Sequence, residues 1–150
     1  ICDMMAQIQA PEKGRTDLKV NDPACGSGRM LLAFNKLAPG NYLVGQDKDP
    51  ICTKMTAINL ALHGCKGQSV NGDSLMPDDF LFGYEVNPFI HLTNGLPNLK
   101  PVSKFESVAW QVWESKKQEV KSINDKQNIE VEQKPAIMEQ VVPGLQLTLF

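Results

Sequence analysis

The sequence contains no run of apolar residues long enough to cross a membrane and no secretory pattern at its N-terminus, so we expect a cytoplasmic protein. It also has few cysteines. The four are Cys2, Cys25, Cys52 and Cys65, and none of them belongs to a Cys-x-x-Cys pair. We therefore expect reduced thiols and no metal site. A net charge of −2 excludes a general affinity for nucleic acid, so any contact with DNA needs a local basic patch.

The 150 residues suffice for one folded domain, along which short β-like segments alternate with helical patterns. We expect strands at residues 18–21, 42–45, 68–71 and 80–86, and helices at 1–8, 28–37, 50–62 and 104–123. In the third helix, Asp49 is the expected N-cap, and Ile51, Met55, Ile58 and Leu62 share one apolar face. The alternation predicts an α/β fold with a parallel sheet over residues 1–123. The polar composition after residue 123 predicts a flexible linker that begins a separate tail, residues 124–150.

The most informative segment is Asp22–Gly28, which reads DPACGSG and lies between an expected strand and an expected helix. Glycines let the backbone approach a ligand closely, and a helix N-terminus offers free N–H groups, so this arrangement predicts a nucleotide-sized pocket. The dinucleotide fingerprint needs a third glycine, where this chain has Leu31. Asp22 would repel a pyrophosphate but attract a cation. S-adenosylmethionine carries a sulfonium and an ammonium and no phosphate, so we predict it as the cofactor.

Two further acids follow expected strands. Asp47 comes about twenty residues after Gly28, which is the usual spacing of a ribose-binding acid; the alternative is a carboxylate at the entry of the next helix. Asp73 follows the third strand, at the end that faces the ligand crevice in doubly wound sheets; the alternative is a turn aspartate after Gly72. Asp22 has its own alternative, a plain Asp-Pro turn.

Residues 18–75 resemble the cofactor half of DNA adenine-N6 methyltransferases, and are most similar to the modification subunits of type I restriction systems and to phage or plasmid methylases. Three segments carry the resemblance: Asp22–Leu32, Gly45–Asp47 with its following helix, and Asn71–Leu75. The resemblance implies a partial or minimal Rossmann-like core, a methyl donor and a DNA substrate. The family has an upstream segment and further strands, and this chain starts at Ile1, so we expect a fragment.

The resemblance also implies roles for single residues. Asp22 would face the methionine end of the cofactor, Asp73 would accept the adenine amino group, and Leu75 would pack on the ring. Cys25 is a small packing residue rather than a nucleophile, since no general base lies nearby in sequence. The predicted cofactor-binding residues are Asp22, Pro23, Cys25, Gly26, Gly28, Asp47, Asp73, Ser74 and Leu75.

The expected catalytic residues are Asn87, Pro88 and Phe89, which resemble a family loop that reads Asn-Pro-Pro followed by Phe or Tyr. In that loop, the Asn side chain and a Pro carbonyl accept hydrogen bonds from the target amine, and the aromatic ring stacks on the flipped base. One proline is missing here, which would displace the second acceptor. The alternative is a plain Asn-Pro turn. Glutamine-N5 methyltransferases share the loop, so RNA or a protein glutamine stays open as substrate.

The last residues resemble the pentapeptide by which bacterial proteins bind the replication sliding clamp. The family pattern is Q-L-S/D-L-F, and this chain matches it at Gln146, Leu147, Leu149 and Phe150. The alternative is a terminal strand that docks on the chain's own sheet. A second hypothesis for the whole chain follows: a degenerate methylase fold that serves as an accessory factor docked on the clamp.

Overall fold

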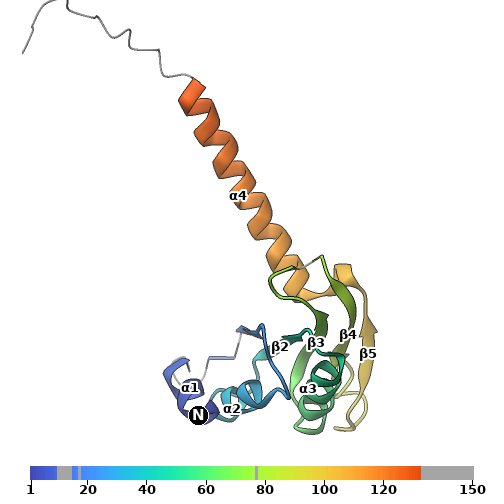
Figure 1. The fold of residues 1–150 in the computed structure, drawn as a ribbon. Helices are drawn as coiled ribbons and strands as arrows, with labels where there is room; N and C mark the ends of the chain where they lie inside the picture. Colours follow the sequence, from blue (N-terminus) through green and yellow to red (C-terminus); the bar gives the residue numbers. More distant parts are fainter. Residues whose placement is uncertain (10–14, 17, 77, 133–150) are drawn as a thin grey trace, which may run out of the picture. The chain divides into compact units, whose positions relative to one another are not determined.

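The computed structural model describes residues 1–9, 15–16, 18–76 and 78–132. The chain divides into two compact units, Ile1–Lys116 and Lys117–Phe150, and the strands and the helices α1, α2 and α3 belong to the first. In the described part of the chain, five strands form one sheet in the order β1-β2-β3-β4-β5 (Figure 1). The strands are β1 (Lys19–Asp22), β2 (Tyr42–Asp47), β3 (Lys66–Gly72), β4 (Phe80–Val86) and β5 (Leu99–Val102).

The α/β class is confirmed, but the sheet is mixed rather than wholly parallel. β1, β2 and β3 are parallel to one another, whereas β4 pairs antiparallel with β3 and β5 pairs antiparallel with β4. The cause is the short connection from Gly72 to Phe80, because a parallel crossover needs a dozen residues or more. The end of β4 therefore returns to the start of β3, where Val86 pairs with Gly67.

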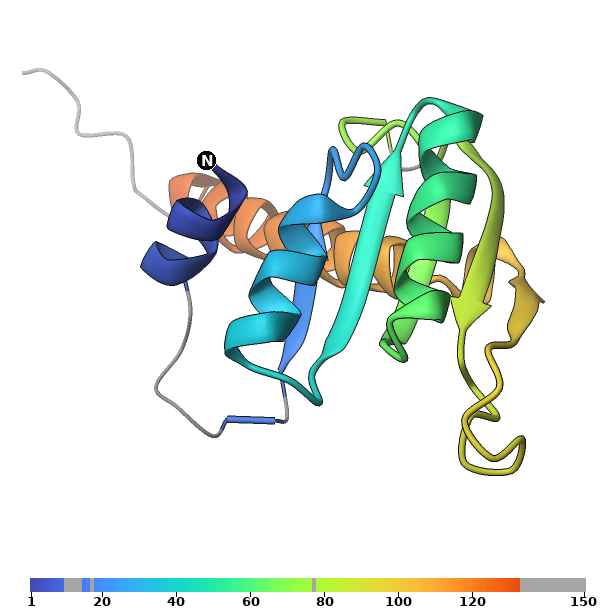
Figure 2. The ribbon, with the colours of Figure 1, turned by 90° about the horizontal axis from the view of Figure 1, so that it is seen from below.

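Two helices connect the parallel strands and cover the same face of the sheet (Figure 2). α2 (Arg29–Leu37) packs on β1 and β2, and α3 (Pro50–Leu62) packs on β2, β3 and β4. α1 (Cys2–Gln9) packs on α2. The core between these layers includes Ala6, Leu31, Phe34, Leu43, Leu60, Ala61 and Val86.

α3 begins as the sequence predicts, because Asp49 is its N-cap and accepts a 2.7 Å hydrogen bond from the Ile51 N–H. Its buried face, however, consists mostly of small residues, Thr53, Thr56, Ala57 and Ala61, with Leu60 as the larger exception. A methyl group added at Gly45 of β2 would lie 2.9 Å from Thr56, so the helix approaches the strand closely at this point. The larger apolar residues Ile51, Met55, Ile58 and Leu62 therefore lie on the exposed side of the helix.

The chain after β5 forms a short 3₁₀ turn, η1 (Lys104–Glu106), and the helix α4 (Val108–Glu132). Ser103 and Glu106 form a capping box at the start of the turn. α4 continues to Glu132, past the expected helix end at Ile123. Residues 124–132, which were expected to begin the linker, are therefore helical. Among the described helices, none combines the length and apolarity needed to span a bilayer.

Gly67→Ala should abolish the register between β2 and β3. A methyl group at this position would lie 1.7 Å from the Leu43 carbonyl oxygen, so the strands must separate. We expect urea unfolding to show a loss of about 4 kcal/mol or more in the free energy of unfolding. The control is Gly26→Ala, because a methyl group added at Gly26 would have no atom within 4 Å. This variant loses only the free energy of placing an alanine in a left-handed backbone conformation, about 1–2 kcal/mol. Equal losses in the two variants would contradict the assigned register.

Candidate functional site

The glycine turn lies between β1 and α2 and is held by backbone hydrogen bonds. Gly26 and Gly28 adopt left-handed conformations, with φ of 55° and 78°. The Cys25 N–H donates to the Gln46 carbonyl at 2.9 Å, and the Gly28 N–H donates to the Cys25 carbonyl at 2.8 Å. Gly28 also serves as the N-cap of α2 without a side-chain bond, so the turn leaves the N-terminus of that helix free of a side-chain cap.

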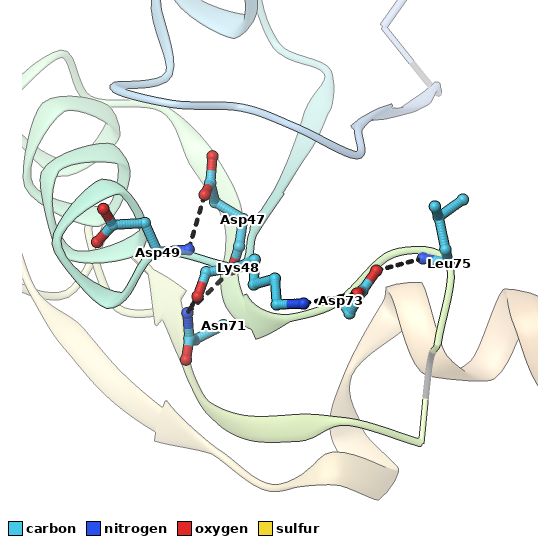
Figure 3. A network of polar contacts seen from close by, with 6 residues as sticks. All are labelled: Asp47, Lys48, Asp49, Asn71, Asp73 and Leu75. Atoms are coloured by element: carbon cyan, nitrogen blue, oxygen red, sulfur yellow. Dashed lines mark hydrogen bonds and ion pairs between the residues drawn. The ribbon is translucent and has the colours of Figure 1, made fainter.

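Asp47 ties the end of β2 to this turn. One carboxylate oxygen accepts a hydrogen bond from the Gly26 N–H at 2.8 Å. The other accepts a hydrogen bond from the Asp49 N–H at 2.9 Å, which Figure 3 shows. A carboxylate has about four acceptor positions, so both oxygens keep capacity for a ligand. Asp47, the predicted ribose-binding acid, thus also holds the turn in its conformation. It lies at the entry of α3 as well, which is what the alternative interpretation expected.

Asp73 follows β3 and is oriented by two partners. It accepts a 2.9 Å hydrogen bond from the Leu75 N–H and forms a 3.1 Å ion pair with Lys48 (Figure 3). Two hydrogen bonds lower the pKa of this carboxyl below its ordinary value. The bond from the Leu75 N–H has the larger effect, and the bond from Lys48 has the next largest. Asp73 therefore stays ionised at neutral pH and has an exposed lysine as its counter-charge.

Asp22, Asp47 and Asp73 share one edge of the sheet, because β1, β2 and β3 are parallel and adjacent and each acid lies at a carboxyl end. Asp22 also forms the expected Asp-Pro type of turn, in which its carboxylate accepts the Ala24 N–H at 3.2 Å. None of the three acids lines the cavity of the described chain that lies beside this edge. The residues next to them in sequence do, since Pro23, Gln46 and Ser74 line a cavity of about 200 Å³.

The predicted catalytic loop lies at the opposite edge of the sheet. Because β4 is antiparallel, Asn87 follows its end beside the start of β3 rather than beside the acids. Asn87 is fully buried; its amide donates to the carbonyls of Ala61 and Cys65 at 3.1 and 2.8 Å, and its oxygen accepts the Asn98 N–H at 3.0 Å. The donors are used within the chain, and the oxygen, the atom expected to accept the target amine, is buried and already accepts the Asn98 N–H. This is the environment of the alternative, an Asn-Pro turn.

Two other predicted contacts differ from the expectation. Pro88 and Phe89 lie with Asn87 at the far edge, and the Phe89 side chain is half exposed. Leu75 is 89% exposed and does not line the cavity of about 200 Å³, and its packing on an adenine ring stays a prediction. The clamp-like residues Gln146, Leu147, Leu149 and Phe150 lie outside the described part of the chain, and that prediction stays a prediction.

Cys25 is buried in the glycine turn, with its sulfur 3.4 Å from the Thr56 hydroxyl. Burial raises the pKa of its thiol to about 11, against a smaller lowering by the Thr56 hydrogen bond. The thiol is protonated at neutral pH, and a protonated thiol is a poor nucleophile. This environment agrees with the packing role inferred for Cys25.

One buried residue of the site has no role in the sequence reasoning. Asn71 is fully buried, and its amide donates to the Asp47 and Lys48 carbonyls at 2.9 and 3.1 Å (Figure 3). It thereby fixes the chain just after the ribose-type acid. Its position in the Asn-Gly-Asp segment was visible, but no pattern in the sequence indicates that an asparagine there holds the neighbouring strand.

A glycine turn and an acid at the end of the second strand, both at the carboxyl edge of parallel strands, define a Rossmann-like α/β domain. The model of the family described as N-6 DNA Methylase matches residues 1–94. This match covers more than half of the chain, so the chain belongs to that family.

Curated relatives support the assignment. The chain is similar to the type I restriction enzyme MjaVII methylase subunit of Methanocaldococcus jannaschii, with 39% identity over 67 residues, 39% of this chain and 12% of the relative. It is 35% identical to the MjaVIII methylase subunit of the same organism over 86 residues, 53% of this chain and 14% of the relative. The chain thus spans about one-eighth of the length of these relatives. No solved structure matches the chain significantly.

Asn87→Ala tests the structural role of this side chain. It removes both donors and the acceptor, so we expect the free energy of unfolding to fall by about 2–4 kcal/mol in urea. Asn94→Ala is the matched control, because Asn94 has the same left-handed backbone, with φ of 52° against 56°, but an exposed side chain. Equal effects of the two substitutions would show that the buried hydrogen bonds contribute nothing.

The Cys25 thiol should make stability depend on alkaline pH. The pKa of this thiol is raised in the folded chain. The protonated thiol therefore contributes fully to the free energy of unfolding below pH 9, and this contribution is lost as the pH rises toward 11. We expect the stability difference between the native chain and Cys25→Ala to narrow by up to about 2 kcal/mol over this range. Urea unfolding at pH 8 and at pH 11 measures it, and a constant difference would contradict the shift.

Proposed function

We propose that this chain is the cofactor-binding part of a DNA adenine-N6 methyltransferase and that S-adenosylmethionine is its methyl donor. The hydrogen bond from the Gly26 N–H to Asp47 carries the proposal, because it fixes a ribose-type carboxylate against the glycine turn. The family, N-6 DNA Methylase, and the similarity to methylase subunits of type I restriction enzymes support DNA as the substrate over RNA or a protein glutamine.

The residues at this edge fit the donor in charge and in shape. Asp47 has free acceptor positions for the two ribose hydroxyls, and charge-assisted bonds of this type contribute about 1.5–3 kcal/mol each. Asp22 presents negative charge to the ammonium end, and Asp73 remains ionised beside the same edge. Gly26 and Gly28 let the backbone approach the ligand closely because neither carries a side chain.

When bound, S-adenosylmethionine supplies an electrophilic methyl group on its sulfonium. This chain's own acids orient the donor and balance its positive charge at a sheet edge. The described residues do not place an amine-orienting loop there, since Asn87, Pro88 and Phe89 follow the antiparallel β4. We therefore assign cofactor binding to this chain, and methyl transfer to the complete enzyme. Docking on the sliding clamp through residues 146–150 is a separate prediction that rests on the sequence alone.

Asp47→Asn should weaken the binding of S-adenosylmethionine at least tenfold in calorimetry, because it removes the charge from the ribose-binding carboxylate. Asp49→Asn is the matched control: it removes a nearby charge, and asparagine is an equally good N-cap for α3. We expect less than a twofold change for it. Circular dichroism checks that both variants fold. Absence of binding to the folded native chain, or equal weakening by the two variants, would refute the proposal.

A further inference from the structure

The cavity of about 200 Å³ beside the edge with the three acids has aromatic and amide side chains among its walls. Asn21, Gln46 and Phe80 come from the strands, whereas Trp110 and Trp113 come from the first turns of α4. Cavities that hold whole small molecules measure about 300–1,000 Å³, so this one suits a single ring system. Its walls favour a flat ring, since aromatic side chains stack on nucleobases.

Trp110 is held in place but lacks a hydrogen-bond partner. Its ring meets the Phe105 ring edge to face, with centroids 5.3 Å apart, and the Lys104 ammonium lies 5.9 Å from its centroid. Within the described chain, its indole nitrogen Nε1 is buried without a partner. A buried tryptophan N–H normally finds an acceptor, and an unpaired one is costly. A hydrogen-bond acceptor brought by a ligand would satisfy this N–H.

The amide side chains narrow the ligand further. Gln46 is 8% exposed and lines the cavity, as does Asn21 at the end of β1. Asparagine and glutamine amides pair with adenine, whose amino group and ring nitrogen offer one donor beside one acceptor. Another ring nitrogen of adenine would accept the Trp110 N–H. Gln46 directly precedes Asp47, so the cavity adjoins the strand end that carries the ribose-type acid.

We propose that Trp110, Trp113 and Gln46 form a pocket for an adenine ring. Two ligands carry this ring, the methyl donor and a DNA strand with an unpaired adenine, and both belong to the proposed function on which this inference rests. The aromatic walls come from α4 rather than from Leu75, which lies in solvent. Two groups determine the selectivity of this pocket for adenine: the N–H of Trp110 and the amide of Gln46.

The two tryptophans of the chain both line this cavity, so intrinsic fluorescence reports on it without a label. We expect saturable quenching by S-adenosylhomocysteine if the donor's adenine enters, and by a deoxyadenosine oligonucleotide, but not a thymidine one, if the target base enters. Either result supports the pocket. Trp110→Phe keeps a ring but removes the donor, so its Kd should rise about threefold to tenfold. Gln46→Leu should have a similar effect, and Trp113→Phe, which keeps a ring for stacking, less than twofold.

Calorimetry with S-adenosylhomocysteine separates this inference from the proposed function. Binding that depends on Asp47 but leaves the fluorescence unchanged, and is equal in Trp110→Phe and Gln46→Leu, overturns the pocket and retains the cofactor site. Quenching by the deoxyadenosine oligonucleotide without any binding of S-adenosylhomocysteine supports the pocket and refutes the cofactor site. Absence of quenching by every ligand overturns the pocket. Circular dichroism checks the folding of each variant.

Discussion

The site depends on one carboxylate. Asp47 accepts N–H groups from the glycine turn and from the entry of α3, so it connects two loops that follow different parallel strands. Asn71 strengthens this junction from β3 by holding the carbonyls of Asp47 and Lys48. The same group that a ribose would contact therefore maintains the shape of the surrounding backbone. Ligand binding and local folding are coupled at this point, because both use the oxygens of one side chain.

Local signals predicted the local structure at the edge that carries the three acids. Glycines with left-handed backbone, an acid at the N-cap of α3 and short strands between helices are short-range features, and the structure has each of them. The expectation of a parallel sheet was wrong for β4, which is antiparallel to β3. The direction of strand pairing is a long-range property. The length of the connection could nevertheless have been used, because the seven residues between Gly72 and Phe80 are too few for a parallel crossover.

Other parts of the site had no readable signal. Asn87, Pro88 and Phe89 resemble the expected catalytic motif in sequence. What they can contact depends on the sheet edge at which β4 ends. No sequence pattern singled out Trp110 and Trp113 as cavity residues, and only the tertiary structure places them beside the ends of β1 and β2. In α3, the larger apolar residues share one face as expected, but that face is exposed, because Thr56 on the other face packs closely against Gly45.

The outward apolar stripe of α3 affects how the chain behaves in salt solutions. Ile51, Met55, Ile58 and Leu62 are between 45% and 68% exposed, and a net charge of −2 gives little mutual repulsion between molecules. Sulfate and similar ions strengthen the tendency of such surfaces to leave water. The identity of the anion, more than the ionic strength, therefore governs the concentration at which this protein stays in solution.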